Sequence, residues 1–297
     1  MRNVAVVLFL VLMSAAAELS GMQEVIFPEA GALCVGLWLM PKAVWNVRTR
    51  QVPLLLTVAA LIGLAVNLLL PFGFGLRFLV AFCLVSLLLH LVRCNMYPVV
   101  SAAMLPVLMG TTSWVYPASV LVLSSLLAVG RWWLPQETRP DYHPYGLKHW
   151  LKLAVALCLF LMLEAVVGRL MPSFSPAMLT YMSVPPLVVT MIEFANRRSG
   201  FHERTWTIWG LIVAAAAVGT LAEWGLHRTL GLPMAMGVLV SSGVMLLLFR
   251  RFKPFAPALA IAMVPLLLPI RVLLWFPLLA AVGAAYFILV GKYLSTR

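Results

Sequence analysis

The sequence predicts an all-α polytopic membrane protein with about 10 to 12 transmembrane segments in two tandem repeats. Three observations predict this fold. The composition is too apolar for water, hydrophobic segments recur along the whole chain, and one pattern of prolines occurs in each half. The prolines also predict that each repeat contains short helices broken by proline.

The composition excludes a water-soluble fold. Of the 297 residues, 63% are hydrophobic and only 10% are charged, and the mean hydropathy is +1.03. A soluble domain carries about 25% charged residues, so most of this chain must face lipid or other apolar helices. The formal net charge of +12 would suggest nucleic acid in a soluble protein. In a membrane protein, an excess of basic residues instead indicates which loops lie in the cytoplasm. We therefore expect membrane lipids and no nucleic acid as partners.

Hydrophobic segments divide the chain into two similar halves. A bilayer requires about 20 apolar residues per helix, and twelve segments, several of them short, approach this length. Residues 131–149 between the halves form the longest polar stretch, which predicts a first membrane repeat over 1–131, a cytoplasmic linker over 132–146 and a second repeat over 147–297. The segments are 4–17, 25–40, 52–70, 76–92, 97–109, 114–130, 147–167, 177–194, 206–226, 232–249, 254–268 and 272–291.

The basic residues predict the orientation. Cytoplasmic loops are enriched in lysine and arginine because translocating them is unfavourable. With the N-terminus in the cytoplasm, all but four of the 21 basic residues fall on the cytoplasmic side, the exceptions being Arg77, Arg169, Arg228 and Arg271. We therefore expect an integral protein of the plasma (cytoplasmic or inner) membrane with both termini in the cytoplasm. The first 17 residues also fit a cleavable signal peptide, which stays an alternative.

A proline pattern in the fifth segment of each half indicates an internal duplication. Pro98 and Pro106 lie eight residues apart with Ala-Met at the same offset as between Pro257 and Pro265. An even number of segments per half makes the two copies enter the membrane in the same sense. If the short fifth segment only re-enters the membrane, the repeat is inverted instead.

The prolines also point to a substrate site. A helix broken at membrane depth persists only where protein or a polar cavity satisfies its backbone, and Pro28 and Pro185 place a second break in each half. Broken segments at matching positions of two repeats indicate a midplane binding site in transporters. The alternative is that these prolines only kink membrane helices.

Polar residues in or beside these segments are the candidate site. Ionisable groups are costly inside a membrane and mark functional sites, and Glu29 directly follows Pro28. Arg271, near a helix start, would suit an anionic group. The alternative is that these polar residues have structural roles. They could reach the membrane interface, pair with one another or satisfy backbone groups freed by the prolines. The candidate substrate-binding residues are Glu29, Gly31, Asn95, Tyr97, Ser101, Thr111, Thr112, Tyr181, Ser183, Glu193 and Arg271.

Several classes of site have no counterpart in the sequence. It contains no HExxH or CxxC pair for a metal, no GxxxxGK[ST] or GxGxxG loop for a nucleotide and no GxSxG elbow for a nucleophile. We therefore expect no catalytic residue, no metal and no cofactor, and the chain is not predicted to be an enzyme.

Two elements resemble the HPP family of integral membrane proteins. Residues 27–32 (Phe-Pro-Glu-Ala-Gly-Ala) are similar to the turn that opens one helix in that family, and residues 97–106 with Trp114 are similar to its His-Pro-Pro element. Here Tyr97 replaces the histidine and Val99 the second proline. The resemblance implies a polytopic, transporter-like fold, with plant relatives associated with nitrite movement.

Together these observations predict a membrane transporter or channel for a small, anionic solute. The alternative is a lipid- or isoprenoid-handling protein, or a membrane subunit or scaffold of a larger complex. Two kinds of assembly remain alternatives, namely a homo-oligomer and a complex with a partner subunit.

Overall fold

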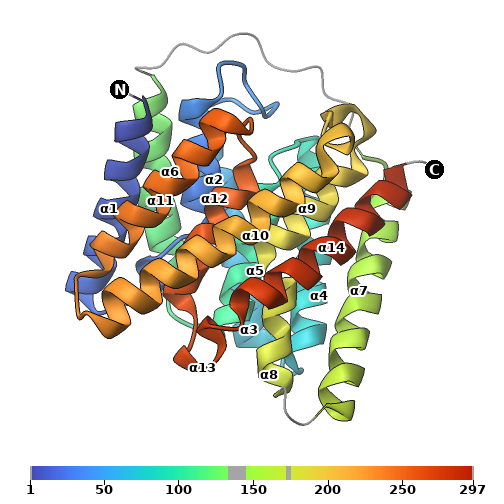
Figure 1. The fold of residues 1–297 in the computed structure, drawn as a ribbon. Coiled ribbons are helices and arrows are strands. Elements are labelled where there is room, and N and C mark those ends of the chain that lie inside the picture. The colour runs from blue at the N-terminus through green and yellow to red at the C-terminus, as the bar shows by residue number, and fades with distance from the viewer. Residues whose placement is uncertain (1, 133–144, 172–174, 296–297) are drawn as a thin grey trace.

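A computed structural model describes residues 2–132, 145–171 and 175–295. The regular structure of the described residues is all helical, with no strand among them (Figure 1). Most of the predicted linker over 132–146 lies outside the described residues, since these omit 133–144. Helix α1 begins and helix α14 ends toward the upper side of Figure 1.

Within the described residues, eight helical stretches are long and apolar enough to cross a membrane, which indicates an integral membrane protein and confirms the predicted all-α polytopic class. The stretch over Ala177–Ala195 ends with α9, and the stretch over His202–Thr229 contains α10 and the π-helical η6. The long helices are α1 (Arg2–Ser20), α3 (Gln51–Leu69), α4 (Phe74–Val92), α7 (Leu147–Leu170), α10 (Thr205–Ala222) with η6 (Glu223–Thr229), α11 (Met234–Arg251) and α14 (Phe276–Ser295). Helix α9 itself is short and spans Pro185–Ala195.

The remaining predicted segments are shorter helices. Helix α6 (Val115–Arg131) follows α5, and four short units lie at the centre of the molecule (Figure 1). These central helices are α2 (Glu29–Cys34) continued by η2 (Val35–Leu39), α5 (Pro98–Met109), α9, and α12 (Ala256–Met263) continued by η7 (Val264–Leu267). The short connecting turns are η1 (Gln23–Val25), α8 (Pro176–Leu179), η3 (Thr180–Ser183), η4 (Arg197–Ser199), η5 (His202–Arg204) and α13 (Ile270–Leu273).

The central helices are buried on all sides, whereas the long helices around them expose apolar side chains. Every residue of α5 from Pro98 to Val107 is buried, as expected for a helix that is apolar around its whole circumference. On α1, Val4, Leu8 and Leu12 are each more than half exposed. Such an extended apolar surface is stable only against lipid.

The prolines begin helices more often than they break them. Pro98 and Pro185 occupy the first positions of α5 and α9, where a missing N–H costs little because that donor has no partner within a helix. Pro106 lies inside α5 without ending it, so the prediction of a break there is wrong. Pro265 lies in η7, where the α-helical geometry of α12 has given way to a 3-10 turn.

Tyr116 compensates the defect that Pro106 makes in α5. A proline inside a helix leaves the carbonyl four residues earlier without its usual donor, and that carbonyl belongs to Ala102. The hydroxyl of Tyr116, fully buried on α6, donates a hydrogen bond of 2.9 Å to the oxygen of Ala102. A helix with an internal proline is thereby kept continuous.

We expect the substitution Tyr116→Phe to lower the free energy of unfolding by about 1 to 3 kcal/mol, because it leaves the buried carbonyl of Ala102 unsatisfied. Thermal stability of the purified protein in detergent measures this. Tyr181→Phe is the control, because no hydrogen bond from the Tyr181 hydroxyl is present in the described part of the chain. Equal stability of the two variants would contradict this role of Tyr116.

Four helix contacts join the two halves of the chain. Helix α1 packs on α11, and α7 packs on α4; α2 packs on α12, and α9 packs on α5. Each contact joins an element of residues 1–131 to one of residues 147–297. A close helix approach also occurs twice, because a Cβ on Gly63 of α3 would overlap the carbonyl oxygen of Ala103, and one on Gly219 of α10 would overlap that of Ala262.

Candidate functional site

Two cavities lie at opposite ends of the central helices. The wide cavity has a volume of 710 Å³ and is lined by Gly21, Gln23, Glu24, Leu108, Met109, Gly110, Thr111, Thr112, Ser113, Tyr181, Leu267 and Pro269. The narrow cavity has a volume of 30 Å³, room for about two water molecules, and is lined by Val35, Gly36, Met40, Val44, Trp45, Pro98, Val189, Glu193, Phe201, Pro254, Ala256 and Pro257. We call the two ends of the molecule the wide side and the narrow side after these cavities.

Helix α5 connects the two cavities. Pro98 at its start lines the narrow cavity, and Leu108 and Met109 at its end line the wide cavity. Helix α12 with η7 runs in the same sense, from Pro257 at the narrow cavity to Leu267 at the wide cavity. Both cavities therefore lie at the interface between the two halves of the chain.

Polar groups fix the wall of the wide cavity. The hydroxyl of Thr111 donates a hydrogen bond of 3.3 Å to the carboxylate of Glu24. The amide nitrogen of Asn67 donates to the carbonyl oxygens of Pro106 and Thr111, at 2.7 Å and 2.8 Å. Asn67 on α3 thus satisfies carbonyls at the end of α5 and holds the loop that carries the predicted residues Thr111 and Thr112.

A buried carboxyl lies between the cavities. Glu29 is 1% exposed, and its Oε1 accepts a hydrogen bond from the hydroxyl of Ser101 on α5. Its second oxygen, Oε2, has no hydrogen-bond partner among the described residues. At a rise of about 1.5 Å per residue, Ser101 lies about 5 Å along α5 from Pro98 and about 12 Å from Met109. A buried carboxyl with an unsatisfied oxygen is costly. Glu164 shares this feature, so the position between the two cavities is what distinguishes Glu29.

The centre between the cavities is closed by helix packing. A Cβ on Gly31 of α2 would lie 3.0 Å from the backbone of Leu259 on α12. Only glycine allows this approach without displacing one of the helices. The predicted residue Gly31 therefore belongs to the closed centre and lines neither cavity.

The narrow cavity holds a second carboxyl. Glu193 of α9 lines it, and its side chain makes no hydrogen bond or ion pair with any other described residue. The indole of Trp45 closes the cavity against Gly36, where any Cβ would overlap the ring. Among the described residues that line the two cavities, none is a lysine or arginine.

Asn95 and Tyr97 stabilise the narrow side. Asn95 accepts a hydrogen bond of 2.6 Å from the backbone N–H of Asn46, which fixes the loop that carries Trp45. The ring of Tyr97 stacks on that of Tyr145, with centroids 5.9 Å apart, and the Tyr145 hydroxyl donates a hydrogen bond of 3.0 Å to the carbonyl of Ile192 on α9. These two predicted residues therefore position the chain around the cavity and do not line it.

Two predicted residues lie away from both cavities. Ser183 donates a hydrogen bond of 3.3 Å to the carboxylate of Glu164 on α7, so it pairs with a peripheral helix. Arg271 is exposed on α13. The arginine that suggested an anionic solute is therefore not part of the central interface.

The structure brings seven of the predicted residues to the cavities or the closed centre between them, namely Glu29, Gly31, Ser101, Thr111, Thr112, Tyr181 and Glu193. Sequence reasoning missed Glu24, Asn67, Trp45 and Tyr145. Glu24 could have been found, since it is one of only nine acidic residues and precedes Pro28 by four positions.

Comparison with protein-family models, curated proteins and solved structures finds no match to this chain. The resemblance to the HPP family therefore stays a prediction.

Proposed function

We propose that this protein is a membrane transporter or channel that moves a small solute along the interface between its two halves. The observation that carries the proposal is the pair of cavities at opposite ends of α5 and α12, with the buried carboxyl of Glu29 between them. A path open at the wide side and closed at the centre is one state of an alternating-access cycle.

The proposal includes two tandem repeats, because alternating access is commonly a movement of one repeat against the other. The exchanged contacts of α1 with α11 and α7 with α4 support such a pairing, as do the matched close approaches at Gly63 and Gly219. The short central helices then meet at an axis between the repeats.

The distribution of basic residues supports an orientation with the narrow side in the cytoplasm. Helices α6, α11 and α14 carry basic residues in their last turns. All three end on this side, since Arg131 lies beside Trp45, α11 ends before Pro254 and Gly291 packs against Ala195. Since positive residues are retained in the cytoplasm, the wide cavity then faces the outside.

The charge of the lining favours a cation or a neutral solute over an anion. Glu24 lines the wide cavity and Glu193 the narrow one, and Glu29 lies between. Carboxylates along a path are typical of cation pathways, whereas arginine and lysine line anion pathways. A test must nevertheless include anions, because the sequence alone predicts an anionic solute.

Flux into proteoliposomes tests the proposal, with potassium, ammonium, chloride and nitrite as solutes. A cysteine at Thr112, in the wide cavity, is expected to make flux of the permeant solute fall about tenfold after labelling with a bulky, membrane-impermeant thiol reagent. Gly73→Cys is the control, because Gly73 is exposed in the α3–α4 turn and a side chain there meets no atom within 4 Å. Failure of every solute to permeate, or equal effects of the two labels, would contradict the proposal.

The native cysteines allow this design. Cys34 and Cys94 are buried, and burial raises the pKa of the Cys94 thiol to about 11, so that little reactive thiolate forms there. Cys83 is exposed and Cys158 is partly exposed. A background with Cys83→Ser and Cys158→Ser therefore suffices.

A further inference from the structure

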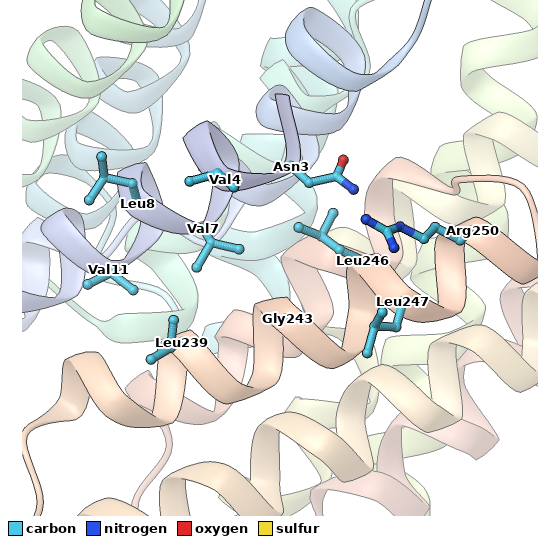
Figure 2. A pocket seen from close by; sticks show the side chains of 10 residues that line it. All are labelled: Asn3, Val4, Val7, Leu8, Val11, Leu239, Gly243, Leu246, Leu247 and Arg250. Atoms are coloured by element: carbon cyan, nitrogen blue, oxygen red, sulfur yellow. The ribbon is translucent and has the colours of Figure 1, made fainter. Parts of the chain in front are cut away.

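A lateral groove lies between α1 and α11, outside the central interface. It has a volume of 450 Å³, and its lining side chains extend from the two helices toward each other (Figure 2). Val4, Leu8 and Leu247 of this lining are each more than half exposed. We propose that this groove binds an acyl chain of an anionic phospholipid, with the lipid phosphate at Arg250 and Asn3. The groove is lined by Asn3, Val4, Val7, Leu8, Val11, Leu239, Gly243, Leu246, Leu247 and Arg250.

The length of the groove matches one leaflet. Its lining residues extend from Asn3 to Val11 on α1 and from Leu239 to Arg250 on α11. At about 1.5 Å per residue these spans are about 12 Å and about 17 Å. Half of a hydrocarbon core of about 30 Å is about 15 Å, so one extended chain reaches from the headgroup level to the bilayer centre.

The absence of a side chain at Gly243 gives the groove its depth. A Cβ placed on this residue would meet no atom within 4 Å, and apolar side chains of both helices flank it (Figure 2). The body of the groove is apolar, and only the end formed by Asn3 and Arg250 is polar. A single acyl chain with a polar headgroup has the same distribution.

Charge complementarity selects an anionic headgroup. The guanidinium of Arg250 makes no hydrogen bond or ion pair with another described residue, and its side chain is exposed. Asn3 points toward it across the end of the groove (Figure 2). Arginine forms paired, charge-assisted hydrogen bonds with phosphate, and the unpaired N–H groups at the start of α1 favour the same charge.

The site lies at a contact between the two halves. Helix α1 belongs to residues 1–131 and α11 to residues 147–297. The corresponding contact of α4 with α7 is filled by the rings of Phe82 and Trp150, whose centroids are 6.4 Å apart. Those rings are buried, whereas Val4 and Leu8 in the groove are each more than half exposed, so the groove is open to lipid.

Native mass spectrometry of the detergent-solubilised protein, titrated with phosphatidylglycerol and phosphatidylcholine, tests the proposal. We expect phosphatidylglycerol to bind the wild type about fivefold more tightly than phosphatidylcholine, the effect of one basic residue on an anionic lipid. Arg250→Gln is expected to remove this preference. Gly243→Leu is expected to weaken binding of both lipids, because it fills the groove without a clash.

Two matched control variants distinguish lipid binding in the groove from binding elsewhere on the surface. Arg251→Gln removes the neighbouring charge, which lies over the ring of Phe252. Gly210→Leu adds the same volume as Gly243→Leu at an exposed, unobstructed position of α10. Both controls are expected to bind lipid as the wild type does. Equal binding of the two lipids by the wild type, or loss of preference in Arg251→Gln but not in Arg250→Gln, would overturn the proposal, and neither result depends on transport.

Discussion

Replacing Gly219 with alanine is expected to destabilise the protein severely. A Cβ at this position of α10 would overlap the carbonyl oxygen of Ala262 and lie 3.0 Å from Cγ of Pro265 on the neighbouring short helix. Both atoms are held by a buried helix and cannot move aside as a flexible side chain could. Overpacking of this kind costs about 3 kcal/mol or more. Gly63→Ala is expected to act alike, because its Cβ would overlap the carbonyl oxygen of Ala103.

The same helix provides the control. Gly210 also lies in α10 and is exposed, and a Cβ added there would meet no atom within 4 Å. Gly210→Ala is therefore expected to be neutral or slightly stabilising, since alanine favours a helix. The fraction of protein that stays monodisperse after heating, measured by size-exclusion chromatography, compares the variants. Equal loss in Gly210→Ala and Gly219→Ala would show that helix approach does not explain the effect.

Most of the fold could be predicted because it depends on hydrophobic segments. The bilayer requires long apolar runs, and all twelve predicted segments contain a helix. The short fifth segment of each half was also expected from its length. The continuity of α5 through Pro106 could not be predicted, because it depends on a hydrogen bond from Tyr116, ten residues later in the sequence.

The sequence predicts those residues of the candidate site whose side chains are energetically unfavourable in an apolar segment. Glu29 could be found because a carboxyl beside Pro28 in an apolar segment is unusual. Arg271 has the same kind of signal, yet it is exposed on α13, since a cation at a helix end can reach the interface. The roles of Asn67 and Trp45 depend on contacts between distant segments, which one sequence does not show.

The substitution Glu29→Gln is expected to reduce solute flux about tenfold or more while leaving the fold intact. Glutamine has nearly the same volume, and its amide oxygen can still accept the hydrogen bond from Ser101. The change removes the negative charge and the titratable proton from the closed centre of the path. If the solute interacts with the carboxylate in the transition between states, the barrier rises by about 1.4 kcal/mol for each tenfold loss.

Glu164→Gln is the matched control for this substitution. Glu164 is also buried and also accepts a hydrogen bond from a serine, Ser183, but it lies on the peripheral helix α7, outside the lining of both cavities. Initial rates of flux into proteoliposomes, normalised to the amount of folded protein, compare the two variants with the wild type. We expect Glu164→Gln to retain most of the flux. Equal rates in the two variants would place the carboxyl of Glu29 outside the path, because burial and serine pairing alone would then account for both effects.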